Sequence, residues 1–247
     1  MCESLRQLGL QSGDAVMVHA SLRAIGEIEG GAEGLVRNLL RVLGNPGTLM
    51  AYVDFHPTAE IPYFDPPRSP ACPEYGVLAE IIRTWPGAKR SQNPGASVAA
   101  IGARAEWLCR NHPLNFGYGP KTPFARLIDA EGGVLLLGSD PNNVTLLHHA
   151  EHLAKLPGKR IIKRTDKILQ DGGICHVQIE EYDTSQPVIS AMPGDYFGRI
   201  VKAFLKTGLG KTGKVGNADC ALLPADALVR FAVAMMENEF GAANSRK

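Results

Sequence analysis

Two patterns of apolar residues alternate along the first 55 residues, and they predict different elements. Residues 15–19 (AVMVH) form a continuous apolar run, which is typical of a strand buried on both faces. Residues 31–43 instead carry leucines and a valine at helical spacing. A short helix is expected at 3–9 and a second strand at 48–55. Residues 15–55 therefore predict a β-α-β unit, the building block of a mainly parallel sheet covered by helices.

The alternation continues through the rest of the chain. The clearest buried strand is 134–138 (VLLLG), and a helix is expected from about 144 to 156 after a polar turn. Residues 160–169 and 174–182 predict two paired strands around the turn DGG. Further expected elements are a strand at 97–101 and helices at 76–85, 103–110, 195–207 and 225–240. We predict a single α/β domain over residues 1–247, with a mixed, mainly parallel sheet flanked by helices.

Composition narrows the class of protein. Hydrophobic residues make up 45% and charged residues 21% of the chain, which is ordinary globular usage and excludes a disordered chain. The net charge of +1 gives no global field for nucleic acid or a membrane surface, so neither is expected as a partner. The beginning of the chain has no signal-peptide pattern. The five cysteines include no CxxC pair, which predicts reduced thiols and a cytoplasmic location.

Two segments rich in proline or glycine interrupt the pattern. Residues 56–75 hold six of the 17 prolines and predict a long irregular loop. Residues 111–123 (NHPLNFGYGPKTP) predict a second loop. Long loops within compact domains are often functional, so both are candidate site segments.

The densest set of chemically active side chains is 142–152 (NNVTLLHHAEH). It follows a strand and a polar turn, where α/β proteins bind ligands. On a helix beginning near residue 144, Thr145, His148 and His152 would share one face, and His149 would point elsewhere. Three interpretations stay open: ordinary helix histidines, a zinc site on the HxxxH spacing, and a general-base histidine with a nearby hydroxyl. The zinc interpretation lacks a third ligand at recognisable spacing.

Several other patterns fail as motifs. Residues 208–215 (GLGKTGKV) nearly match a phosphate-binding loop, but Val215 stands where the magnesium-binding hydroxyl belongs. Residues 23–28 (RAIGEI) miss the pyrophosphate loop of the histone-type acetyltransferases, and no GxSxG elbow exists. The basic run 155–167 is interpreted as a solvated strand face.

Six segments together resemble the aminoglycoside 3-N-acetyltransferase family, and they occur in order over nearly the whole chain. They are 17–26 (MVHASLRAIG) with 29–33 (EGGAE), 87–91 (GAKRS) with Pro94 and Ser97, 119–127 (GPKTPFARL), 134–138 continuing through VTLLHHAE to Glu151, 179–183 (IEEYD), and 213–216 (GKVG). The resemblance implies an α/β sandwich distinct from the histone-type acetyltransferase fold. In one departure, Asn93 occupies a position where relatives commonly have histidine.

The resemblance implies acetyl transfer from acetyl-CoA to the 3-amino group of a 2-deoxystreptamine ring, conferring antibiotic resistance, with His148 as the base. Thr145 is expected to polarise the thioester. Glu181 is the first choice to orient His148, with Glu180, Asp183 and Asp195 as alternatives. No metal cofactor is expected. The residues expected to bind acetyl-CoA are His19, Ala20, Ser21, Leu22, Arg23, Lys89, Arg90, Ser91, Thr122 and Phe124. The carboxylates expected to bind the cationic substrate are Asp54, Asp65, Glu74, Glu151, Asp183 and Asp195.

Two alternatives remain at this stage. The chain could be an acyl-CoA-dependent N-acetyltransferase for a different amine, because the 56–75 loop matches the family poorly and such loops often set substrate choice. It could also be a non-catalytic acyl-CoA-binding module, although such a module would not need Thr145, His148 and Glu151 together. A monomer and a homodimer are both compatible with the sequence.

Overall fold

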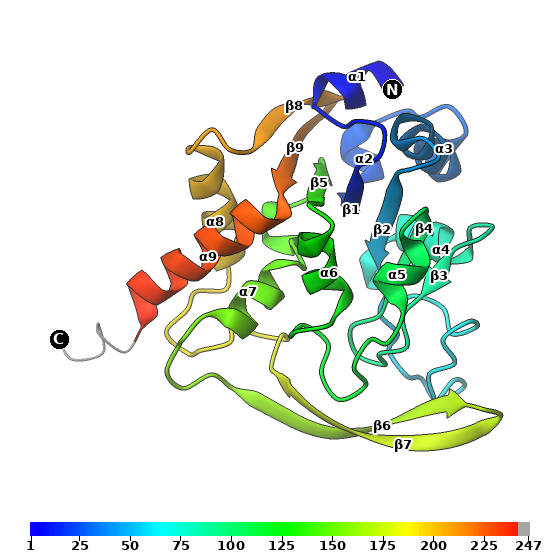
Figure 1. Ribbon diagram of the computed structural model, residues 1–247, viewed down its shortest axis with the longest axis vertical. Helices are drawn as coiled ribbons and strands as arrows, with labels where there is room; N and C mark the ends of the chain where they lie inside the picture. The colour runs from blue at the N-terminus through cyan, green and yellow to red at the C-terminus, as the bar shows by residue number, and fades with distance from the viewer. Residues whose placement is uncertain (242–247) are drawn as a thin grey trace.

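A seven-stranded mixed sheet forms the centre of the computed structural model, which describes residues 1–241 (Figure 1). Its strands run in the order β3-β4-β2-β1-β5-β9-β8. Their bounds are β1 Ala15–Ala20, β2 Thr48–Tyr52, β3 Lys89–Arg90, β4 Val98–Gly102, β5 Gly133–Leu137, β8 Lys211–Val215 and β9 Ala218–Pro224. Strands β2, β1 and β5 are parallel, and every pairing outside them is antiparallel. The parallel strands are thus the middle of the sheet.

Helices cover both faces of this sheet. They are α1 Cys2–Gln7, α2 Leu22–Ile25, α3 Gly31–Leu43, α4 Val77–Thr84, α5 Ala105–Cys109, α6 Pro123–Asp129, α7 Leu147–Leu153, α8 Tyr196–Leu205 and α9 Ala225–Phe240. Two short 3-10 turns, Pro73–Tyr75 and Pro141–Asn143, precede α4 and α7. The predicted α/β class, mixed sheet and flanking helices are confirmed. Residues 242–247 of the predicted domain lie outside the described residues.

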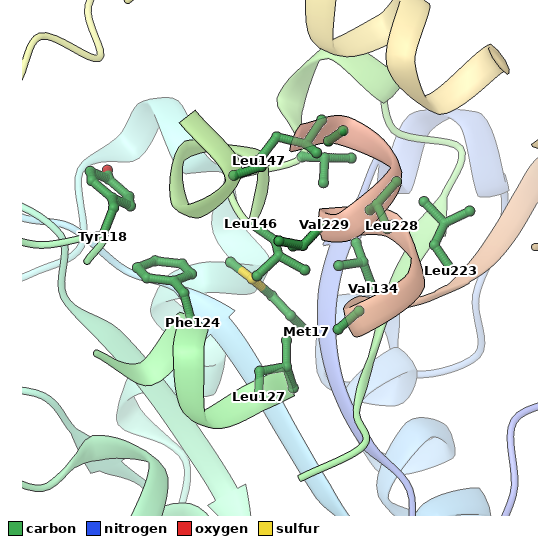
Figure 2. Packing of buried hydrophobic residues seen from close by; sticks show 14 of the residues in the cluster. Met17, Tyr118, Phe124, Leu127, Val134, Leu146, Leu147, Leu223, Leu228 and Val229 are labelled. Atoms are coloured by element: carbon green, nitrogen blue, oxygen red, sulfur yellow. The ribbon is translucent and has the colours of Figure 1, made fainter. Parts of the chain in front are cut away.

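Alternate residues of each central strand enter two separate cores. In β1, Val16 and Val18 pack with α1, α3 and α4, whereas Met17 packs on the opposite face with α5 to α9. Figure 2 shows part of this second core, where Met17 and Val134 lie among side chains of α6, α7 and α9. Because both faces are buried, the central strands are continuous apolar runs, and this explains why β1 and β5 were recognisable in the sequence.

A two-stranded arm lies apart from the main sheet. Strands β6 (Ile161–Gln170) and β7 (Gly173–Tyr182) pair antiparallel over ten residues and form the long ribbon in Figure 1. The loop between β2 and α4 contacts this arm, because Phe64 and Lys167 share a backbone hydrogen bond of 2.8 Å. This hairpin was predicted. Among the helices of residues 1–241, none combines the length and the apolar character that crossing a membrane requires.

The structure corrects the sequence-based description at several elements. Helix α7 begins at Leu147, so Thr145 precedes the helix instead of lying on its face. Strand β8 falls within the failed phosphate-loop motif at 208–215, and strand β9 and helix α6 were not expected at all. Four of the five residues of β8 are exposed, so no apolar pattern marked it as a strand.

Candidate active site

A cavity of about 690 Å³ lies at the carboxyl ends of the three parallel strands. Its walls come from His19 and Ala20 at the end of β1, Tyr52 at the end of β2, and the segment that follows β5. Loops from parallel strands converge at this edge, so residues far apart in the sequence meet there. The 3-10 turn before α4 adds Glu74 and Tyr75 on another side.

Gly138 allows the chain to turn away from β5 at this cavity. Its φ of +65° lies in the left-handed region, and a Cβ there would fall 2.6 Å from Cβ of Ala24 and 2.8 Å from Cβ of Ala218. Only glycine satisfies both the backbone angle and the close approach of these neighbours. The backbone then leads through Ser139 and Asn143 toward α7, and these residues line the cavity.

His148 lies where this cavity meets a second one of about 340 Å³. Its Nδ1 is 2.7 Å from Oε2 of Glu151, one turn later in α7. Glu151 is buried, and a buried carboxylate is stabilised by such a charge-assisted bond. With Nδ1 as the donor, Nε2 carries the lone pair and has no protein partner within residues 1–241. The arrangement therefore presents an unpaired ring nitrogen where the two cavities meet.

Two aromatic rings pack against the His148 imidazole. The Tyr118 ring lies 5.0 Å from it and the Phe197 ring 4.9 Å, measured between centroids. Tyr118 also shares a hydroxyl–hydroxyl hydrogen bond of 2.9 Å with Tyr52. These three aromatic residues come from separate segments that no local sequence pattern connects, so they were not among the expected site residues.

Thr145 joins His148 in the wall of the larger cavity. The backbone N–H of His148 donates to the Thr145 carbonyl at 3.1 Å, which fixes the spacing of the two residues in a tight turn before α7. The Thr145 hydroxyl makes no hydrogen bond within residues 1–241 and is free to donate to a ligand.

Glu181, the first choice to orient His148, does not contact it. The Glu181 carboxylate accepts hydrogen bonds from the backbone N–H groups of Gly117, Tyr118 and Tyr182. Of the alternatives, Glu180 pairs with Lys163 on the arm. Glu151 is the actual partner of the ring, and it had been assigned to substrate binding. The spacing of three residues within one helix was the signal that favoured Glu151.

The other two carboxylates considered for orienting His148 also pair with arginines. Asp183 lies 3.3 Å from Arg160, and Asp195 lies 2.9 Å from Arg199. Both had also been expected to bind the substrate. Neither lines either cavity, so neither is placed to do so there.

The first part of the expected acetyl-CoA segment lines the larger cavity. His19, Ala20 and Ser21 do so, whereas Leu22 and Arg23 belong to α2 and lie outside the lining. Ser21 caps α2 by accepting a hydrogen bond from the Ala24 N–H. Nε2 of His19 has no hydrogen-bond partner in the described part of the chain, and burial lowers the pKa of His19 to about 4. A neutral imidazole is therefore available for hydrogen bonding with a ligand in this cavity.

Lys89, Arg90 and Ser91 are not at the cavity, in contrast to the sequence-based expectation. They lie on and beside β3 at the edge of the sheet. Lys89 pairs with Glu106, and Arg90 donates to the carbonyls of Val53 and Ser69. The Ser91 hydroxyl is 2.9 Å from the His112 ring. These side chains hold the 56–75 loop and the edge of the sheet.

Thr122 and Phe124, also expected to bind acetyl-CoA, line neither cavity. Thr122 caps α6 through the Ala125 N–H and donates to the Gly119 carbonyl, and Phe124 is fully buried in the core.

Asn93, the departure from the family pattern, is buried and donates to the carbonyls of Pro113 and Phe116. It lines neither cavity, so it shapes the second loop and has no contact with a ligand there.

Among the expected substrate carboxylates, Glu74 and Glu151 line a cavity. Asp54 and Asp65 are buried away from both, and burial raises the pKa of Asp54 to about 7. Such a carboxyl group is not a permanent anion. Asp140, which the sequence analysis did not select, lines the larger cavity. The charges available for a cation are therefore Glu74, Asp140 and Glu151.

The structure does not bring His148 and His152 together in a group of potential metal ligands within residues 1–241. His152 lines neither cavity, and its ring packs against Phe116 and Tyr182. Within residues 1–241, the group of three or more side chains that could hold a metal ion is His56, Cys72 and Glu74, and it does not include His148.

The family of this chain follows from comparison with known proteins. The family model described as aminoglycoside 3-N-acetyltransferase matches residues 17–237. Aminoglycoside N(3)-acetyltransferase III of Pseudomonas aeruginosa is 40% identical over 258 residues, covering 98% of this chain and 93% of its own length. The chain belongs to the aminoglycoside 3-N-acetyltransferase family. The resemblance inferred from the sequence segments is thereby confirmed.

Solved structures of this family share the fold over nearly the whole chain. AAC-IIIb in a binary complex with CoASH superposes with a TM-score of 0.94 at 41% identity, covering 98% of this chain and 96% of that one. AAC-VIa with bound sisomicin, studied by neutron and X-ray diffraction, superposes with a TM-score of 0.90 at 35% identity, covering 97% of each chain. The family fold thus accommodates a coenzyme A molecule in one case and an aminoglycoside in another.

Proposed function

We propose that this protein transfers the acetyl group of acetyl-CoA to the 3-amino group of the 2-deoxystreptamine ring of aminoglycosides, and so confers resistance to them. Family membership and the ligands of AAC-IIIb and AAC-VIa support this activity. The observation that carries the proposal is the position of His148, paired with Glu151 and lining both cavities.

His148 is the general base of the proposed reaction. Glu151 holds Nδ1–H, so Nε2 accepts the proton of the attacking amine, and the carboxylate stabilises the imidazolium that forms. Bound acetyl-CoA supplies a thioester carbonyl carbon, to which the C–N bond forms while the C–S bond breaks. The proton on His148 then passes to the departing sulfur. The Thr145 hydroxyl donates to the carbonyl oxygen as negative charge develops there.

The larger cavity is suited to two kinds of ligand. No lysine or arginine of residues 1–241 lines it, so this part of the chain offers no counter-charge there to the phosphates of acetyl-CoA. We therefore place the pantetheine arm along His19–Ser21 and the segment after Gly138, with the nucleotide outside the cavity. Glu74 and Asp140 carry the negative charge that a polycationic aminoglycoside requires.

A turnover assay tests this proposal. Release of free CoA is measured with acetyl-CoA and a panel of sisomicin, gentamicin and simple amines, and NMR locates the amide in the product. The expected result is acetylation of the 3-amino nitrogen of the deoxystreptamine ring. An amide on another nitrogen would refute the regiochemistry. Turnover with simple amines alone would instead support a different substrate, and binding of acetyl-CoA without any turnover would support a non-catalytic module.

Variants of His148 and Glu151 test the roles of these two residues. His148→Ala is expected to lower kcat by roughly 10²–10⁴-fold in a protein that still folds, because the base is lost. Glu151→Gln should lower kcat by about tenfold or more, since a neutral amide cannot stabilise the imidazolium. The matched control is His176→Ala, which changes an exposed histidine on the arm. Near-normal turnover by a folded His148→Ala protein would remove the base assignment.

A further inference from the structure

The segment Gly117–Gly119 has no regular secondary structure, yet four buried side chains bind its backbone. One Glu181 oxygen accepts from the N–H of Gly117 and, at 3.3 Å, from the N–H of Tyr118. Three other side chains bind the carbonyls of the segment. Nε2 of His112 lies 2.9 Å from the Gly117 carbonyl oxygen, and Nδ1 of His149 lies 2.6 Å from the Tyr118 carbonyl oxygen. The Thr122 hydroxyl donates to the Gly119 carbonyl at 2.7 Å.

These bonds account for the buried charge of Glu181. A carboxylate removed from water is costly unless donors surround it, and Glu181 has three backbone donors, the third being the N–H of Tyr182 at 2.8 Å. The segment also packs tightly, because a Cβ at Gly117 would lie 2.2 Å from Cβ of Ala96. Little freedom remains for the backbone of this segment.

The side chain that this backbone presents is Tyr118. Figure 2 shows it at the margin of the core, next to Phe124, whose ring centroid is 5.1 Å away. On another side the Tyr118 ring packs against His148 at 5.0 Å. The imidazole thus has Glu151 at Nδ1 and rings of Tyr118 and Phe197 against it. The His148 ring is held by contacts from α7, α8 and the 117–119 segment.

We propose that Glu181 is a positioning residue that acts through Tyr118: its carboxylate fixes the 117–119 backbone, and the Tyr118 ring in turn fixes the orientation of the His148 imidazole. The catalytic consequence rests on the proposed function, in which His148 is the base. A displacement of about 1 Å in a reacting group can cost roughly 10²-fold in rate. A residue that contacts neither substrate is therefore expected to influence kcat.

The first test compares Glu181→Gln with Glu180→Gln. The amide NH₂ of glutamine cannot accept a hydrogen bond, so at least one backbone N–H loses its acceptor. We expect kcat to fall by about tenfold or more, with KM for both substrates changed less than kcat, because Glu181 itself lines neither cavity. Glu180 is the adjacent residue on the opposite, exposed face of β7, and its variant should behave as the wild type. Glu181→Asp, which keeps the charge, should recover part of the rate and serves if Glu181→Gln fails to fold.

A double-mutant cycle tests whether the effect passes through Tyr118. If it does, Tyr118→Leu combined with Glu181→Gln should be no slower than Tyr118→Leu alone. A purely structural role would give independent, multiplicative losses and would overturn the proposal.

An NMR measurement tests the positioning without reference to activity. The carbon-bound ring protons of His148 experience ring currents from Tyr118 and Phe197, so their chemical shifts report the ring geometry. We expect these shifts to move in Glu181→Gln and to stay in place in Glu180→Gln. Unmoved shifts would overturn the positioning role even if His148 is the base. Moved shifts with unchanged kcat would retain the positioning and count against His148 as the base.

Discussion

At the scale of single residues, neutral histidines are structural parts of this site. His112 is buried, with one ring nitrogen bonded to Ser91 and the other to the carbonyl of Gly117. Since the Gly117 carbonyl can only accept, the ring donates through Nε2 and accepts at Nδ1, which is the pattern of a neutral imidazole. Burial lowers the pKa of His112 to about 4. The ring would lose this arrangement on protonation.

This predicts a pH-dependent stability that depends on His112. The folded pKa of about 4 lies below the unfolded value of 6.5, so the unfolded chain binds the proton first as the pH falls. The contribution of His112 to the free energy of unfolding is complete above pH 6.5 and is lost between pH 6.5 and pH 4. This loss amounts to at most about 3 kcal/mol. His112→Gln should therefore show a smaller decrease of unfolding free energy over this range in urea denaturation. His176→Gln is the exposed control, and identical pH dependence in wild type and His112→Gln would contradict the assignment.

At the scale of elements, the arm and the 56–75 loop form one packing unit. Ile168 of β6 is buried against Phe64 and Phe55, and Phe64 makes backbone hydrogen bonds with both Lys167 and Leu169. The same loop carries Glu74 and Tyr75 to the larger cavity. The stability of the arm is thus linked to the geometry of a cavity wall.

We expect Ile168→Ala to loosen the arm and the loop together. Removing a buried isoleucine side chain typically costs about 2–5 kcal/mol, and here the loss falls on a local unit. Backbone amides of residues 56–75 should exchange with solvent faster, and KM for the aminoglycoside should rise more than kcat falls. Ile174→Ala is the matched control, because this isoleucine of the same hairpin is 50% exposed. Unchanged exchange in the loop would show that it is held independently of the arm.

At the scale of the whole molecule, a net charge of +1 offers no general attraction to a polycation. Attraction must come from local carboxylates, and Glu74 and Asp140 are the ones that line the larger cavity. Exposed charges are screened over about 8–10 Å near physiological ionic strength. Binding of a cationic substrate should therefore depend on salt.

We predict that KM for an aminoglycoside rises with sodium chloride and that Glu74→Gln reduces this dependence. The variant should raise KM more than it lowers kcat, because Glu74 contributes to binding and not to proton transfer. Steady-state kinetics at several salt concentrations provide the measurement. Glu33→Gln, an exposed substitution on α3, leaves the cavities unchanged and is the control. A salt-independent KM would show that the substrate is not held by exposed charge.

Local sequence patterns determined much of the architecture. Continuous apolar runs indicated β1 and β5, helical spacing indicated α3, and the paired strands of the arm followed from a DGG turn. The segment with His148 was also recognisable, because it follows a buried strand. These features depend on neighbours within a few residues, which is the range over which hydrophobic periodicity carries information.

Only the tertiary structure decided which side chains meet. Glu181 and Arg90 are charged residues in family-like segments, yet each binds backbone groups and lines neither cavity. Tyr118 and Phe197 come from distant parts of the sequence, and both rings pack against His148. The physical reason is that a buried charge must be paired with whatever donors or acceptors the fold brings near it, and a sequence pattern does not specify those partners.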